Sequence, residues 1–206
     1  MNVRVPAIGI AFFAVAAMAT SAWAGESKIV DTGIAEFDDV FAKARDIQGS
    51  VQTQNQTMVE GRTNVNTAMG VAADAPLKTA LEDLKTKANG KIKILMEGNV
   101  PKLQASEAVP ENVQKGMDSV NALSDTSGKT SDTADQLLPQ SEALVEATKD
   151  FPGKVPGLVK NPLDVAKKSK LVDKNVKAVA TLPDKVKALK TEAQGVFADV
   201  TAVFGG

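Results

Sequence analysis

The chain has 206 residues, a formal net charge of −1 and no histidine, cysteine or tyrosine. Without histidine and cysteine it lacks the ordinary ligands of zinc, copper and haem, and it cannot form a disulfide or a Ser-His or Cys-His nucleophile. The slightly acidic balance also argues against nucleic acid as a partner. We therefore expect no enzyme activity, no catalytic residues, no cofactor, no metal and no nucleic-acid partner.

Residues 1–24 have the pattern of a secretory signal peptide. Arg4 provides positive charge, residues 7–19 form an apolar stretch, and Ala22-Trp23-Ala24 is an A-x-A-type cleavage site. A membrane anchor is the alternative, but the apolar stretch is short for a helix that spans a bilayer. We expect an exported protein, periplasmic or extracellular, whose mature part is a single helical domain over residues 25–206.

The mature part begins with a long helix, predicted over residues 29–72. Its apolar residues alternate steps of three and four, as in a heptad seam. A second helix is predicted over 76–105, with Asp74 as its cap and Pro76 in its first turn. The alternation at 91–95 is interpreted as too short and isolated to build a sheet.

Two further helices are predicted over 111–150 and 162–204, and the connections between helices contain Pro and Gly. Short connections favour antiparallel neighbours. The fold class we expect is all-α: an elongated up-down four-helix bundle, or antiparallel coiled coil. The net charges of the four segments alternate in sign, at −3, +1, −5 and +5, which favours packing of unlike neighbours.

Polar residues interrupt each predicted helix near its middle, and we interpret them as one polar mid-bundle layer. Its candidate members are Gln48, Asn55, Arg62, Asn89, Thr130 and Pro183. One hypothesis is a polar layer that fixes helix register, as a buried Asn does in a coiled coil. The other is a hydrated pocket or a hinge at which the bundle opens.

A lysine stripe follows one face of the last predicted helix, at Lys167, Lys170, Lys174 and Lys177. Such a stripe opposite a row of valines is typical of a helix that lies on an anionic membrane. It is equally typical of a solvated bundle helix beside acidic neighbours. An anionic lipid surface is therefore a candidate partner.

The function we expect is that of an exported, non-enzymatic binding, scaffold or structural module. The alternatives are a carrier of amphiphilic ligands that opens at the polar layer, and a periplasmic chaperone-like adaptor. A Ser-Lys hydrolase would require a deeply buried lysine with a depressed pKa. A protein partner or self-association is expected, because heptad seams of this length can also be satisfied between chains.

Overall fold

A computed structural model describes residues 28–205, and the predicted signal peptide lies outside the described residues. The chain is mostly helical, which confirms the predicted all-α character, with one small sheet added. The elements in chain order are α2 (Ala35–Met69), α3 (Leu77–Ala88), β1 (Ile92–Glu97), β2 (Val100–Ala105), α4 (Glu111–Thr148), α5 (Phe151–Leu158), α6 (Pro162–Ala180) and α7 (Leu182–Phe204).

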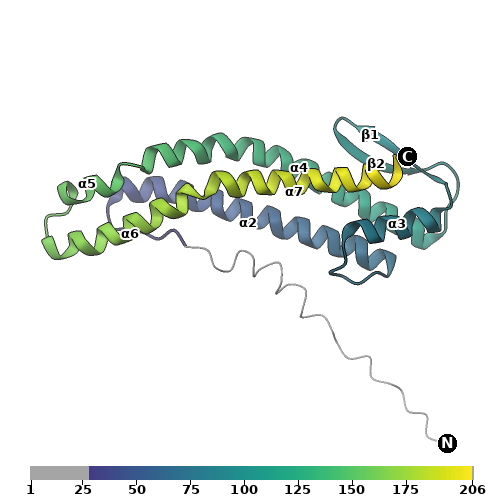
Figure 1. The fold of residues 1–206 in the computed structure, drawn as a ribbon, viewed down its shortest axis with the longest axis horizontal. Coiled ribbons are helices and arrows are strands. Elements are labelled where there is room, and N and C mark those ends of the chain that lie inside the picture. Colours follow the sequence, from purple (N-terminus) through teal and green to yellow (C-terminus); the bar gives the residue numbers. More distant parts are fainter. Residues whose placement is uncertain (1–27, 206) are drawn as a thin grey trace, which may run out of the picture.

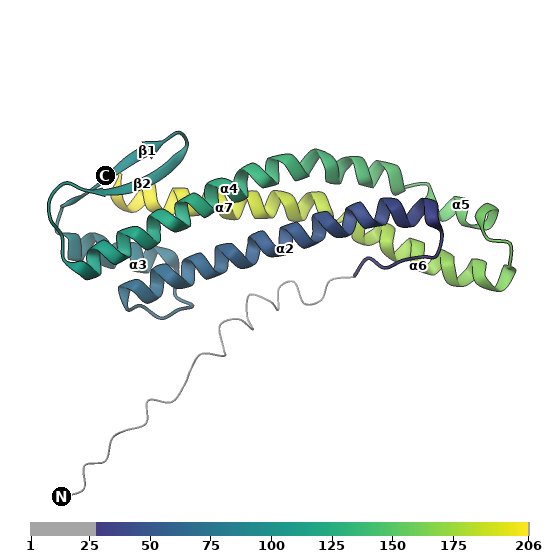
Figure 2. The same cartoon turned by 180° about the vertical axis from the view of Figure 1, so that it is seen from behind.

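Three long helical columns lie side by side along an elongated molecule (Figure 1). The first column is α2, the second is α4, and the third is formed by α6 and α7 end to end. The second column runs antiparallel to the other two. α3 and the β1–β2 hairpin lie at one end of the molecule, and α5 lies at the other, as the reverse view also shows (Figure 2).

The ends of α2 follow from a few local interactions. At its start the Asp38 carboxylate accepts hydrogen bonds from the backbone N–H groups of Thr32, at 2.6 Å, and Gly33, at 2.9 Å. This carboxylate lies in the first turn, where the helix dipole favours negative charge. At its end Gly70 adopts a φ of 73°, and its N–H caps the carbonyls of Asn66 and Thr67.

The predicted helix over 76–105 is wrong beyond Ala88. Asn89 and Gly90 both take positive φ angles, 49° and 79°, and this left-handed backbone ends α3. The chain then forms an antiparallel hairpin in which Ile92 lies opposite Ala105. Its two-residue turn is Gly98-Asn99, and the φ of 62° at Gly98 is what a type II′ turn requires at that position.

The hairpin changes the architecture that we predicted. The described residues contain three long columns instead of four, because only the 12-residue α3 remains of the second predicted helix. The loop after α2 folds back along that helix, where the Asn66 side-chain amide donates to the carbonyls of Ala73 and Ala75. α3 therefore packs beside the C-terminal turns of α2.

The third predicted helix corresponds to α4, whereas the fourth is divided at Thr181 into α6 and α7. Pro183 has no backbone N–H and cannot continue the hydrogen bonding of a single helix. It stands instead in the first turn of α7, where no N–H donor is needed. The region between the third and fourth predicted helices contains the short helix α5.

Two apolar clusters form the core, one at each end of the molecule. The first joins α2, α3, α4, α7 and Leu103 of the hairpin. The second joins the other halves of α2 and α4 to α5, α6 and α7, and Phe151 stacks on Phe37 with ring centroids 4.0 Å apart. Over residues 28–205, each helix is too short or too polar to cross a membrane.

Candidate functional site

The candidate polar layer corresponds in part to a polar interval between the two apolar clusters. The clusters are separated between Val51 and Met58 on α2 and between Leu123 and Ala134 on α4. In this interval α4 buries three hydroxyl groups, those of Ser124, Ser127 and Thr130. Burial removes such groups from water, so each one needs an internal partner if it is not to destabilise the fold.

Thr130 is the one predicted layer residue that lies fully buried in this interval. Its hydroxyl donates to Gln54 Oε1 on α2 at 2.8 Å. The neighbouring Ser127 hydroxyl donates to the Leu123 carbonyl at 2.8 Å. The Thr130 hydrogen bond joins α4 to α2, whereas the Ser127 hydrogen bond lies within α4. A polar bond between two helices at this height is what a register-fixing layer needs.

The other candidate members do not gather at one place. Arg62 forms an ion pair with Glu192 of α7 at 2.8 Å, and Gln48 and Asn55 lie partly buried on α2. Pro183 is partly buried at the start of α7. Asn89 is exposed at the C-terminus of α3 and not in the middle of a helix, because the chain leaves the helix there.

The lysine stripe lies on the exposed face of α6, while Val172 and Val179 on the same helix are buried. Over residues 28–205 its four lysines have no ion-pair partner. Two exposed leucines flank the start of this helix: Leu158 is 46% exposed and Leu163 is 84% exposed. A cationic face beside exposed leucines has the composition of a surface that binds anionic amphiphiles.

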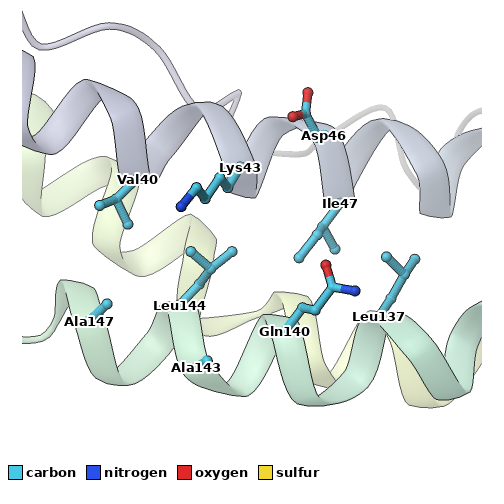
Figure 3. Close-up of a pocket in the computed structure, with 9 residues that line it drawn as sticks. All are labelled: Val40, Lys43, Asp46, Ile47, Leu137, Gln140, Ala143, Leu144 and Ala147. Atoms are coloured by element: carbon cyan, nitrogen blue, oxygen red, sulfur yellow. The ribbon is translucent and has the colours of Figure 1, made fainter.

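A shallow groove of about 500 Å³ lies between α2 and α4, near the α5 end of the molecule (Figure 3). Its wall is mainly apolar, and Ile47 of α2 points toward α4 while Asp46 points away. Lys43 reaches the opening of the groove. The lining residues are Val40, Lys43, Asp46, Ile47, Leu137, Gln140, Ala143, Leu144 and Ala147.

The hairpin offers a more specific feature, because its two outer edges differ. The outer edge of β2 is closed by Asn121 of α4, whose side-chain oxygen accepts from the Leu103 N–H at 2.7 Å. The Asn121 amide also donates to the Leu103 carbonyl at 2.9 Å. Pro101, on the same edge, has no N–H to offer. One asparagine thus occupies the edge of β2 as a neighbouring strand would.

The outer edge of β1 is open. In an antiparallel ladder, residues alternate between facing the partner strand and facing outward. The Ser106 N–H donates to the Lys91 carbonyl at 2.8 Å, so the backbone groups of Lys91 point toward β2. By alternation, so do the backbone groups of Lys93, Leu95 and Glu97. The backbone groups of Ile92, Ile94 and Met96 therefore face outward. In the described part of the chain, no hydrogen bond reaches these three residues from a helix or loop.

The open edge of β1 is also apolar and accessible. Ile92 and Ile94 are partly buried against the first apolar cluster, which holds the strand in place. Leu95 and Met96, by contrast, are 48% and 53% exposed. Native sheets usually protect such edges from contact with other chains. An exposed apolar edge with free backbone donors and acceptors is a surface that can add another strand.

Within residues 28–205, no group of three or more Asp and Glu residues is placed to hold a metal ion. Glu146 raises the pKa of the exposed Lys149 side chain, by accepting its hydrogen bond and by its negative charge. This is the behaviour of a solvated ion pair on a helix surface.

Comparisons of this chain with protein-family models, with curated proteins and with solved structures find no match. The hairpin is the feature that our sequence analysis missed. Its signal was present in Gly98-Asn99, a dipeptide typical of two-residue hairpin turns, after a short run of alternating residues. The Asn121 contact has no sequence signal, because it depends on how the hairpin packs on α4.

Proposed function

We propose that this chain is an exported, non-enzymatic helical scaffold that binds protein by adding a strand to β1. Residues 1–24 act in this proposal as a cleaved signal peptide, so the scaffold works in the periplasm or outside the cell. The observation that carries the proposal is the asymmetry of the hairpin. Asn121 closes the edge of β2, whereas the outward backbone groups of β1 have no partner among the residues described.

Strand addition fits this edge for physical reasons. Main-chain hydrogen bonds provide affinity with little dependence on sequence, and alternate side chains provide specificity. The helical columns hold the hairpin at one end of an elongated body, so the edge is presented away from most of the molecule (Figure 1). An adaptor that captures extended segments of other exported chains is the chaperone-like form of the same proposal.

The proposal is tested by selecting short displayed peptides that bind the purified protein at low micromolar concentration. We expect peptides with alternating apolar residues, and we expect binding to slow amide exchange at Ile92, Ile94 and Met96. The variant Ile94→Pro removes one outward N–H and should lower peptide affinity by about tenfold or more. Ile94→Val is the matched control, because it keeps that N–H. Peptides that bind equally well to Ile94→Pro would contradict the proposal.

A carrier of amphiphilic ligands is the second candidate function, and the groove between α2 and α4 favours it. Its apolar wall suits an acyl chain, and Lys43 at the opening suits an anionic head group (Figure 3). The exposed lysine stripe of α6 offers a second contact for anionic lipid. In this candidate function, the bundle opens at the polar interval to release the ligand from the groove.

Two measurements separate the carrier from the scaffold. A fluorescent fatty acid should bind the protein and be excluded by Ala143→Trp, which fills the groove, whereas Ala188→Trp on the exposed surface of α7 serves as the control. The protein should co-float with anionic vesicles but not with neutral ones, and its binding to the anionic vesicles should depend on the lysine stripe. Absence of both fatty-acid binding and co-flotation would exclude the carrier function.

A further inference from the structure

We infer that the partner of the β1 edge is a second copy of this chain, so that two hairpins join in one continuous four-stranded antiparallel sheet. The inference rests on the proposed function, because it names the occupant of the same edge. It predicts a symmetric dimer in which β1 of each copy lies beside β1 of the other. The evidence lies in which residues of β1 point their backbone groups outward and in the order of its side chains.

The outward direction of alternate backbone groups restricts how two β1 strands can pair. Only residues whose backbone groups face outward can form hydrogen-bonded pairs across the new junction, and these are Ile92, Ile94 and Met96. A two-fold axis at Leu95 places Ile94 opposite Met96 of the second copy, and Met96 opposite its Ile94. All the hydrogen-bonded pairs then join outward-facing residues. A shift of one copy by a single residue would pair outward with inward groups and would forfeit these bonds.

The charges of β1 favour this register. With the axis at Leu95, Lys93 lies opposite Glu97 of the second copy, and the same pair occurs again on the other side of the axis. Within its own hairpin Lys93 lies opposite Gln104, and Glu97 lies opposite Val100. Over the described residues, neither Lys93 nor Glu97 has an ion-pair partner. Opposite charges placed across neighbouring strands stabilise the pairing, and like charges destabilise it.

The competing registers arrange the charges of β1 less favourably. An axis at Lys93 would place the two copies of Lys93 directly opposite each other. An axis at Ile94 would place Lys93 opposite Leu95 and leave Lys93 without an opposite charge. It would place Glu97 opposite Lys91, which already forms an ion pair with Glu107 of its own chain. The axis at Leu95 instead brings together the two Leu95 side chains, each 48% exposed in the single chain.

The size of this junction predicts a weak dimer. Two six-residue strands pair along one edge, and interfaces of this kind lie at the low end of specific contacts, roughly 1,000 Å² in total. We therefore expect reversible association in the micromolar range. The ion pairs lie at the surface, so added salt should weaken the dimer moderately.

Sedimentation equilibrium of charge variants tests the proposal. Lys93→Glu leaves two glutamates on this face of β1, and Glu97→Lys leaves two lysines, so each variant alone should repel its own copies. We expect the dissociation constant of each to rise by about tenfold or more. An equimolar mixture of the two should form a heterodimer about as tight as the wild type. The double exchange Lys93→Glu/Glu97→Lys should restore the homodimer.

The pattern of outcomes also separates this inference from the proposed function. A wild-type protein that is monomeric at millimolar concentration overturns the dimer, and so does a dimer that is indifferent to both charge variants. If that monomer still binds selected peptides at β1, strand addition stands and only the identity of the partner was wrong. If the monomer binds no peptide there, both proposals fail. Ile94→Pro should abolish the dimer and Ile94→Val should retain it, with equal helix content by circular dichroism.

Discussion

At the scale of single residues, Asn121 determines which edge of the hairpin is free. Its side chain donates one hydrogen bond and accepts another from the same residue, Leu103, which is 3% exposed. A carboxamide is well suited to this role, because it carries a donor and an acceptor in the same plane, as a peptide group does. The hairpin is therefore attached to α4 by backbone recognition and by burial of Leu103.

Replacement of Asn121 by alanine should destabilise the fold. Two buried backbone groups of Leu103 would lose their partners, and each such loss costs roughly 1–3 kcal/mol. We expect the free energy of unfolding in urea to fall by about 2–6 kcal/mol. Asn112→Ala, at an exposed position on the same helix, should change it by less than about 0.5 kcal/mol. Equal effects of the two substitutions would show that the contact does not hold the hairpin.

At the scale of elements, the long helices were predicted from the sequence, whereas the hairpin was missed although Gly98-Asn99 carried a weak signal for it. The apolar spacing of Phe37, Phe41 and Ala44 follows the heptad seam, and all three are buried in α2. In the second segment the same spacing drifts after Ala88, and this drift marks the end of the helix. Alternation over a few residues is a weak strand signal, whereas the left-handed backbone at Asn89 and Gly90 emerges only in the folded chain.

The candidate sites show the same division between local pattern and packing. The exposure of the lysine stripe follows from helical periodicity and could be predicted. The burial of Thr130 against Gln54 agrees with a polar layer, but Asn89 was assigned to that layer only because the helix was predicted too long. The free edge of β1 depends on contacts between elements distant in the sequence, and no local pattern encodes it.

Helix packing near α3 provides a test at this scale. Gly116 of α4 is buried, and an added Cβ there would collide with Met69 and lie 3.0 Å from Leu84. Gly116→Leu should therefore lower the free energy of unfolding by about 1–3 kcal/mol through overpacking. Gly49→Ala on α2, where nothing lies within 4 Å, should raise it by about 0.5–1 kcal/mol through helix propensity. Urea unfolding curves measure both free energies of unfolding, which should change in opposite directions. A stable Gly116→Leu variant would contradict the close contact of α2, α3 and α4.

At the scale of the whole molecule, an elongated helical body carries the open edge of β1 at one end (Figure 1). The aromatic content of 4% leaves most of the core to aliphatic side chains packed along slim columns. No cysteine is available, so packing alone must stabilise a protein that we propose to be exported. In the proposed function, the helical columns fix the height and direction at which β1 is offered to a partner.

Export itself can be measured on the intact protein. Mass spectrometry of the chain recovered from the exported fraction should give a mature form that begins at Gly25, about 24 residues shorter than the sequence. Ala24→Asp should block cleavage, whereas Gly25→Ala, on the other side of the bond, should permit it. Recovery of the uncut chain from the membrane fraction would support the anchor and contradict the signal peptide.

The central claim is that residues 91–106 form a hairpin with one open edge, and residue-resolved amide hydrogen exchange of the dilute monomer tests it most directly. The amides of Lys93 and Leu95, which face β2, should exchange slowly, and those of Ile92, Ile94 and Met96 should exchange rapidly. At concentrations that favour the dimer, the amides of Ile94 and Met96, which pair across the junction, should become protected as well. Uniform protection in the dilute monomer, as a continuous helix over 76–105 would give, or uniformly rapid exchange, would contradict the account.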